Sequence, residues 1–303
     1  YKRNATTGVW GDEQKIMAGD RETNDYFGYS VSISGDYAIV GALYEDQSGD
    51  NNTGAAYIFK RNGTTWSQQQ KITEGLRQGD DHFGHSVSIS GDYAIVGVPY
   101  KDNGGNVNEG AVYIYTRNGT TWGDEQKITA SDRAGGDQFG WSVAIDGDYA
   151  IFGARAEDPD DLADAGSAYI FKREGTTWSQ QQKITAIDRQ AQDNFGTSVS
   201  LSGDYAIVGA HNEDDGGNAS GSAYIFKREG TTWSEQAKLV AGDAAANDNF
   251  GYSVSISGDY AIVGAYIEDP GGTDAAGSAY VFKREGTTWS QIAKIFASDK
   301  ASS

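Results

Sequence analysis

A segment that begins with Phe-Gly recurs five times along this chain, and its spacing restricts the folds that the chain can adopt. Successive copies begin 56, 56, 56 and 55 residues apart, at Phe27, Phe83, Phe139, Phe195 and Phe250. A fixed period of this size is typical of propeller blades or of a solenoid. We therefore expect residues 1–303 to form a single domain, with a partial repeat at 1–20 and full repeats at about 21–76, 77–132, 133–188, 189–243 and 244–303.

The first complete repeat predicts four antiparallel strands. Residues 30–34 alternate, with Val31 and Ile33 on one side and serines on the other. Residues 37–40 are apolar on both faces, as expected of a strand between two packed layers. Residues 55–59 are again apolar and run toward Asn62-Gly63, a strong hairpin signal. Residues 66–72 carry enough polar side chains to form an exposed edge.

Four strands in each repeat predict an all-β protein, a β-propeller of about five four-stranded blades with the first strand of each blade nearest the axis. No segment shows helical periodicity. An open β-solenoid is the structural alternative, but hairpins about every dozen residues argue against it.

One copy of the outermost strand is left over. The five full repeats supply complete sets of strands, the last ending with residues 289–295, yet residues 10–16 are a sixth copy of the outer strand. This surplus N-terminal strand could flank the ring. It could instead take the outer place on the last blade and free the C-terminal copy to pair with another molecule, which would propagate a filament. A third interpretation is that the sequence was cut from a longer array of repeats.

Composition excludes several classes of function. The formal net charge of -19 disfavours nucleic acid and the anionic surface of a bilayer as partners. The absence of cysteine excludes disulfides and thiolate chemistry. The sequence contains no run of eighteen apolar residues, so it predicts no membrane-spanning segment. Residues 1–20 lack the basic and apolar regions of a signal peptide. Because the sequence starts at Tyr1 within a repeat, we expect a processed or excerpted protein.

The recurring residues resemble a known family. Each repeat carries Phe-Gly-x-Ser-Val, then a segment like Gly-Asp-Tyr-Ala-Ile-Val-Gly-Ala, then one like Ala-Tyr-Ile-Phe. This pattern resembles the FG-GAP repeat of integrin α-subunit propellers. It is most similar to the variant in secreted bacterial and algal proteins, in which a Trp strand such as 122–128 or 233–239 closes each unit. The resemblance implies an extracellular or cell-surface protein with a role in adhesion or structure.

Two departures from the family pattern matter. The proline of the Gly-Ala-Pro signature is kept only at Pro99. The calcium loop that integrin-type repeats often carry between the first two strands is replaced by Ser34-Gly35-Asp36 and its equivalents. The metal ligands of the family therefore cannot be transferred to this chain.

Another set of carboxylates gathers at one end of each predicted blade. One aspartate stands two residues before each Phe, and a second follows the second strand. Paired carboxylates beside Gly and Asn could hold Ca²⁺, the one cofactor that the sequence suggests. The alternative, which we favour, is that these side chains cap turns by accepting backbone N–H groups. The ten residues are Asp25, Asp46, Asp81, Asp102, Asp137, Asp158, Asp193, Asp214, Asp248 and Asp269.

Five sequons predict glycan attachment if the host glycosylates the protein. Two of them lie in a hairpin turn that other repeats keep with glutamate in place of asparagine, so turn geometry also explains them. The asparagines are Asn4, Asn51, Asn62, Asn118 and Asn218.

We weigh three classes of function. Five-bladed propellers include glycoside hydrolases, but a catalytic site should break the repeat, and the main breaks form no acid–base pair. They are His82, His85, Lys101, Trp141, Asp146, Arg155 and His211, and we interpret the histidines as surface substitutions.

A lectin would use repeated sites and aromatic platforms. The residue after each Phe-Gly is variable, however, which argues against five identical sugar sites and favours packing between blades. These residues are Tyr29, His85, Trp141, Thr197 and Tyr252.

We therefore expect a non-enzymatic extracellular structural or adhesion module. Its partners would be other copies of itself, in a homo-oligomer or filament, or a cell-surface or extracellular protein or glycan.

Overall fold

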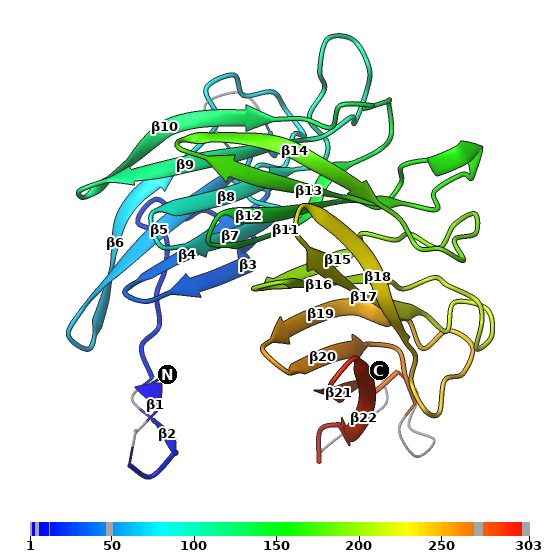
Figure 1. The fold of residues 1–303 in the computed structure, drawn as a ribbon. Helices are drawn as coiled ribbons and strands as arrows, with labels where there is room; N and C mark the ends of the chain where they lie inside the picture. The colour runs from blue at the N-terminus through cyan, green and yellow to red at the C-terminus, as the bar shows by residue number, and fades with distance from the viewer. Residues whose placement is uncertain (1, 4–5, 12, 47–50, 270–274, 299–303) are drawn as a thin grey trace.

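The computed structural model describes residues 2–3, 6–11, 13–46, 51–269 and 275–298. It contains five four-stranded antiparallel sheets, and in each the strands follow chain order from the inner to the outer position (Figure 1). The prediction of an all-β propeller with five blades is thereby confirmed. The described residues include a single helical element, the short 3₁₀ turn η1 (Pro159–Asp161).

The strand bounds repeat closely from blade to blade. Blade 1 contains β3 (Phe27–Ser34), β4 (Tyr37–Ala42), β5 (Ala55–Asn62) and β6 (Thr65–Ile72). Blade 2 contains β7 (Ser86–Ser90), β8 (Tyr93–Val98), β9 (Ala111–Asn118) and β10 (Thr121–Ile128). Blade 3 contains β11 (Phe139–Asp146), β12 (Tyr149–Ala154), β13 (Ser167–Glu174) and β14 (Thr177–Ile184). Blade 4 contains β15 (Ser198–Ser202), β16 (Tyr205–Ala210), β17 (Ser222–Glu229) and β18 (Thr232–Leu239). Blade 5 contains β19 (Phe250–Ser257), β20 (Tyr260–Ala265), β21 (Ser278–Glu285) and β22 (Thr288–Ile295).

Two tight turns set the register of each blade. Ser34 pairs with Tyr37 across Gly35-Asp36, and Asn62 pairs with Thr65 across Gly63-Thr64. Gly35 and Gly63 adopt φ values of 58° and 62°, which glycine reaches without steric strain. With this register, the apolar residues of the middle strands fall on both faces of the sheet, and each blade can pack against two neighbours.

The hydrophobic core lies between consecutive blades. Four clusters each join residues of two neighbouring blades, as Ile39 and Ile58 of blade 1 join Val87 and Val96 of blade 2. The backbones approach closely there, because a Cβ added to Gly97 would lie 2.1 Å from the carbonyl oxygen of Gly140. The repeated glycine at the end of the second strand is therefore needed for blades to stack.

The two end blades differ from the inner ones, because each has one uncovered face (Figure 1). Val31 of blade 1 is 67% exposed, whereas its equivalent Val87 in blade 2 is 7% exposed. Ile262 of blade 5 is 40% exposed, whereas its equivalent Ile207 in blade 4 is fully buried. Blades 1 and 5 therefore do not cover each other's faces as consecutive blades do.

The surplus N-terminal strand is shorter than predicted. Of the described residues in this segment, 10–11 and 13–16, only β2 (Trp10–Gly11) is a strand, and it pairs with β1 (Lys2–Arg3) instead of joining a blade. Residues 13–16 are not in a strand and lie beside blade 1, where Ile16 and Ala18 pack on its core. The physical reason is that an outer strand needs the third strand of a blade as its partner, and among the described residues each third strand already pairs with the outer strand of its own repeat.

Candidate functional site

The aspartates two residues before each Phe cap the loops that lead into the inner strands. In every blade the Oδ2 atom accepts a hydrogen bond from the backbone N–H three residues earlier, at 2.5–2.8 Å. All five carboxylates are buried, and they belong to Asp25, Asp81, Asp137, Asp193 and Asp248. Burial raises the pKa of Asp137 and of Asp193 to about 6. These contacts match the turn-capping interpretation.

The second set of aspartates caps the loops that leave the second strands. Each Oδ1 atom accepts a backbone N–H five or six residues later, at 2.6–2.8 Å. The residues are Asp46, Asp102, Asp158, Asp214 and Asp269. Calcium binding by these ten aspartates stays a prediction, and their hydrogen bonds to the backbone are explained without an ion.

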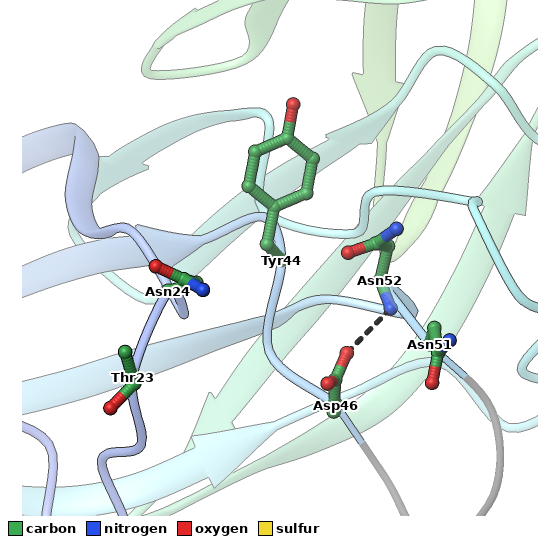
Figure 2. A pocket seen from close by; sticks show the side chains of 6 residues that line it. All are labelled: Thr23, Asn24, Tyr44, Asp46, Asn51 and Asn52. Carbon is green, nitrogen blue, oxygen red and sulfur yellow. Dashed lines mark hydrogen bonds between the residues drawn. The ribbon is translucent and has the colours of Figure 1, made fainter.

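A small polar pocket lies beside one of these loops in blade 1. It has a volume of about 230 Å³ and is lined by Thr23, Asn24, Tyr44, Asp46, Asn51 and Asn52. Figure 2 shows that Asp46 Oδ1 accepts its hydrogen bond from the backbone N–H of Asn52, at one side of this pocket. The lining is polar, but it holds a single carboxylate, so it lacks the several charged ligands of a strong cation site.

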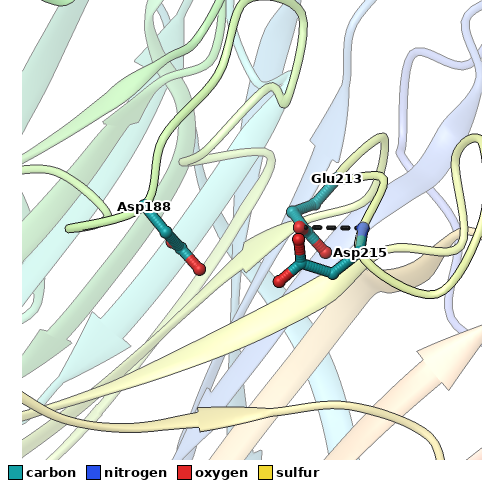
Figure 3. A group of neighbouring side chains, drawn as sticks. All are labelled: Asp188, Glu213 and Asp215. Carbon is teal, nitrogen blue, oxygen red and sulfur yellow. Dashed lines mark hydrogen bonds between the residues drawn. The ribbon is translucent and has the colours of Figure 1, made fainter.

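Another group of carboxylates, which the sequence interpretation missed, meets in blade 4. Ligand atoms of Asp188, Glu213 and Asp215 all lie within 4.8 Å of one another (Figure 3). The ammonium group of Lys238 occupies the centre of this group, at 2.7, 3.0 and 2.5 Å from the three carboxylates. The lysine thereby neutralises the position that a metal ion would take.

The same ion cluster recurs in three other blades. A lysine of the outer strand contacts a glutamate after the second strand and an aspartate from the linker of the preceding repeat. The sets are Lys71 with Glu45 and Asp20, Lys183 with Glu157 and Asp132, and Lys294 with Glu268 and Asp243. This recurrence indicates a structural role, because a unique functional site would break the repeat.

The repeat-breaking histidines are packed within the molecule, which corrects their interpretation as surface substitutions. His85 is 8% exposed, and its ring lies 5.3 Å from that of Tyr29 and 4.3 Å from that of Trp141. His82 packs edge-on between Tyr44 and Tyr100. Burial lowers the pKa of His85 and of His211 to about 4, so both rings are neutral at pH 7.

A set of polar contacts recurs at all four blade-to-blade interfaces. A serine of each inner strand donates its hydroxyl to the backbone carbonyl of the Phe-Gly glycine in the next blade, at 2.7–2.9 Å. The ring of a tyrosine in each second strand also contacts an arginine guanidinium and the edge of a tryptophan ring from the next blade. Between blades 1 and 2, Arg117 lies 4.7 Å and Trp122 5.7 Å from the ring centroid of Tyr37.

The uncovered end faces present the two halves of this same interface. We define the leading face by Tyr29, Val31 and Ile33 of blade 1, and the trailing face by Tyr260, Ile262 and Ile295 of blade 5. These six side chains are 40–67% exposed. The leading face belongs to the blade that carries Arg61 and Trp66, the counterparts of Arg117 and Trp122, and the trailing face contains Tyr260, the counterpart of Tyr37.

The N-terminal segment occupies the place of an outer strand on the leading side. Gln14 Nε2 donates to the carbonyl oxygen of Trp66 at 2.7 Å, and its Oε1 accepts the Trp66 N–H at 2.8 Å. Gln70 makes the same pair of bonds with Trp122 between blades 1 and 2. Asp20 likewise completes the ion cluster of blade 1. This segment therefore acts as the outer edge of a blade whose other strands are absent from the described residues.

The sequons within the described residues lie at the surface. Asn51, Asn62, Asn118 and Asn218 are exposed, whereas Asn4 lies outside the described residues. Glycosylation at these positions stays a prediction.

The FG-GAP repeat family model matches the chain five times, at residues 10–59, 66–115, 122–171, 178–226 and 233–282. These matches cover most of the sequence. The chain belongs to the FG-GAP repeat family. Each match begins at the Trp of an outer strand, so the first unit of the family includes the N-terminal segment.

FG-GAP repeat propellers are generally non-enzymatic and are typical of extracellular or surface proteins. A search of curated proteins finds no match. The described part contains no helix long and apolar enough to cross a bilayer.

Proposed function

We propose that this FG-GAP protein is a non-enzymatic extracellular module with a structural or adhesive role, and that its copies join head to tail into a filament. The observation that carries the proposal is that the leading and trailing faces are the two halves of an interface that the chain already forms four times. An interface of this heterologous type does not close on itself, and it propagates unless the rotation between copies completes a ring.

Apolar exposure supports the proposal. The leading face exposes Val31 at 67% and Ile33 at 65%, and the trailing face exposes Ile262 at 40% and Ile295 at 51%. Their counterparts at the inner interfaces are at most 9% exposed, except the partly buried Val254. Apolar side chains gathered on one face mark a surface that a partner covers.

Polar complementarity selects a second copy as that partner. Tyr260 on the trailing face would meet Arg61 and Trp66 of the next copy, as Tyr37 meets Arg117 and Trp122. Ser253 would donate to the Gly28 carbonyl of the next copy, as Ser198 donates to Gly251. A partner of another kind would have to reproduce these donors and acceptors in the same order.

The N-terminal segment supports strand exchange at this joint. Its residues 10–16 would compete with β22 of the preceding copy, because both are outer strands of the blade before blade 1. Gln14 makes two hydrogen bonds with Trp66 that its counterpart in β22, Ala293, cannot make. Residues 10–16 of one copy would therefore complete the last blade of its neighbour and displace β22.

Two variants that each block one face provide the test. Val31→Glu combined with Ile33→Glu blocks the leading face, and Ile262→Glu blocks the trailing face. Light scattering and electron microscopy should find filaments for the wild type, monomers for each variant alone, and dimers for an equimolar mixture of the two. The mixture forms dimers because each variant keeps one intact face.

Val107→Glu is the matched control, since Val107 is 63% exposed on a loop of blade 2 and belongs to neither face. It should assemble like the wild type. Monomeric wild-type protein at all concentrations, or filaments from either blocked variant, would refute the proposal.

A further inference from the structure

Arg155, in the middle blade, differs from the other arginines of the blades in its partners. Arg61, Arg117, Arg173, Arg228 and Arg284 each form an ion pair with the aspartate of the turn between the first two strands. Within the described residues, Arg155 has no carboxylate within ion-pair distance, and its Nε donates to the neutral amide oxygen of Gln138 at 2.9 Å. In a chain with 43 acidic residues, a half-buried cation without an ion pair needs an explanation.

Arg155 also lies against an aromatic ring. Its guanidinium carbon is 3.2 Å from the ring centroid of Trp141, so that the two planar groups are in contact. Burial lowers the pKa of Arg155, although a guanidinium keeps its charge at any physiological pH. Asp164 raises the pKa of Arg155 electrostatically, but the two side chains form no ion pair. The protein thus holds a positive charge in place without neutralising it.

Aromatic side chains from several blades converge on this cation. Tyr100 contacts the ring of Trp141, and Tyr29 is joined to that ring through His85. Tyr100, Tyr252 and Tyr29 also raise the pKa of Arg155 electrostatically. These tyrosines come from blades 2, 5 and 1, and each is the residue after Phe-Gly or lies in the loop after a second strand. We call Tyr29, Tyr100, Trp141, Arg155, His211 and Tyr252 the aromatic mouth.

Ring contacts join two pairs of mouth residues across blade boundaries. Tyr100 lies 6.2 Å from Trp141, and His211 lies 5.6 Å from Tyr252. Tyr29 and Tyr252 remain 52% and 46% exposed, so ring surface is left for a ligand. His211 is neutral at pH 7 and contacts the Thr197 hydroxyl at 3.0 Å, so it adds a polar group without adding charge.

We propose that the aromatic mouth binds an acidic sugar, that is, a carbohydrate ring bearing a carboxylate, with Arg155 as the partner of the carboxylate. The planar guanidinium matches a carboxylate through two parallel hydrogen bonds, which a lysine could not form. The exposed tyrosine rings can stack on the apolar face of a sugar, and the neutral side chains around them can bond hydroxyl groups.

Charge selects this ligand over an acidic peptide. The mouth offers one cation, and the protein carries a net charge of -19, so a peptide with several carboxylates would be repelled. A sugar ring presents one carboxylate beside a large uncharged surface. At physiological salt, charges beyond about 8 Å are largely screened, so the acidic surface farther away opposes this ligand weakly. This inference goes beyond the proposed assembly, because the mouth contains no residue of the trailing face and shares only Tyr29 with the leading face.

Titration calorimetry with two matched ligands tests the inference. The probes are the monosaccharides galacturonate, with one carboxylate, and galactose, its neutral counterpart, applied to the Ile262→Glu variant so that assembly does not interfere. We expect the acidic sugar to bind at least about tenfold more tightly, which corresponds to about 1.4 kcal/mol.

Substitutions taken from other blades separate the roles of the cation and the ring. Arg155→Leu introduces the residue that Leu43 supplies at this position in blade 1, and it should abolish the preference for the acidic ligand. Trp141→Thr introduces the residue that Thr197 supplies at this position in blade 4, and it should weaken the binding of both ligands. Arg189→Leu removes a cation that pairs with Asp160 outside the mouth, and it should change neither.

Thermal melting checks that each variant folds. Equal binding of the acidic and neutral ligands, no binding of either, or an Arg155→Leu variant that keeps its preference would overturn the inference. Binding of an acidic peptide in place of the sugar would overturn the proposed ligand class.

Discussion

Blades 2 and 4 both carry an ion cluster at the same position, but the lysine comes from a different part of the blade in each. It lies on the outer strand in blade 4 and follows the second strand in blade 2. In blade 4, Lys238 of the outer strand lies among Asp188, Glu213 and Asp215, and the aspartates are about half exposed. In blade 2, Lys101 stands where Glu213 stands in blade 4, and it contacts Glu74 and Asp81 at 3.1 and 2.7 Å. The side chains of this second cluster are at most 4% exposed.

Three sequence changes together account for the exchange. Blade 2 has Lys101 in place of the usual glutamate, Glu74 in place of an alanine such as Ala130, and Leu76 in place of an aspartate such as Asp132. The comparison teaches that the fold requires neutralised charge at this position and tolerates either arrangement of signs. It also predicts different energies, because burial makes an unpaired charge far more costly.

Removing the buried lysine should have the largest effect. Lys101→Met leaves the Glu74 and Asp81 carboxylates, which are 0% and 2% exposed, without a cation. We expect the free energy of unfolding to fall by about 3–5 kcal/mol, as when one partner of a buried ion pair is removed. Chemical denaturation measures it, and a loss below about 1 kcal/mol would show that the buried cluster matters no more than a surface one.

The buried cluster should also make stability depend on pH. Burial and the neighbouring Glu74 carboxyl raise the pKa of Asp81 to about 7, whereas its ordinary value is 3.8. The folded protein therefore keeps a proton that the unfolded chain releases, so this site contributes less stability as pH rises from about 4 to about 7.

Asp81→Asn removes that titration and keeps an oxygen to accept the Gln78 N–H. Denaturation midpoints at pH 5 and pH 8 should differ less in this variant than in the wild type. The exposed control Glu174→Gln should leave the wild-type difference unchanged, and an identical pH response of Asp81→Asn and wild type would contradict the assignment.

The matching substitution in blade 4 should have a smaller effect. Lys238→Met leaves two carboxylates that water can solvate, since Asp188 and Asp215 are 42% and 55% exposed. The third, Glu213, is buried, but it still accepts hydrogen bonds from the Ser222 hydroxyl and the Asp215 N–H. We expect a loss of about 1 kcal/mol in the same denaturation measurement. A loss equal to that of Lys101→Met would remove burial as the basis of the comparison.

The smallest effect should come from restoring one residue of the common cluster. Leu76→Asp supplies Lys127 with the partner that Asp132 provides to Lys183. Leu76 is 83% exposed, so little apolar burial is lost. We expect stability to rise by up to about 0.5 kcal/mol, and the pKa of Lys127, now lowered by burial, to rise. Amine titration by NMR measures the second quantity, and an unchanged Lys127 would argue against the contact.

Some of the candidate sites could be predicted from the sequence, and others could not. The capping aspartates were recognisable, because Asx turns are local and each bond spans three to six residues. The Lys238 cluster was not, because its members are separated by up to 50 residues in sequence. The packed histidines were misread for the same reason, since rings from other repeats help to cover them, as Tyr44 covers His82 and Trp141 covers His85.

The periodicity of the sequence by itself determined the five blades, the order of their strands and the tight turns at Gly35 and Gly63, because these depend on local alternation and on residues next to each other in the chain. Only the tertiary structure decided how the blades end. The same Val and Ile residues are buried in the middle of the array and exposed at its two faces, and the N-terminal Gln14 bonds Trp66 as an outer-strand glutamine bonds the next blade at the inner interfaces. Burial of a repeated residue depends on whether a neighbouring blade follows it, and that neighbour is set by packing in space and not by the residue's own position in the repeat.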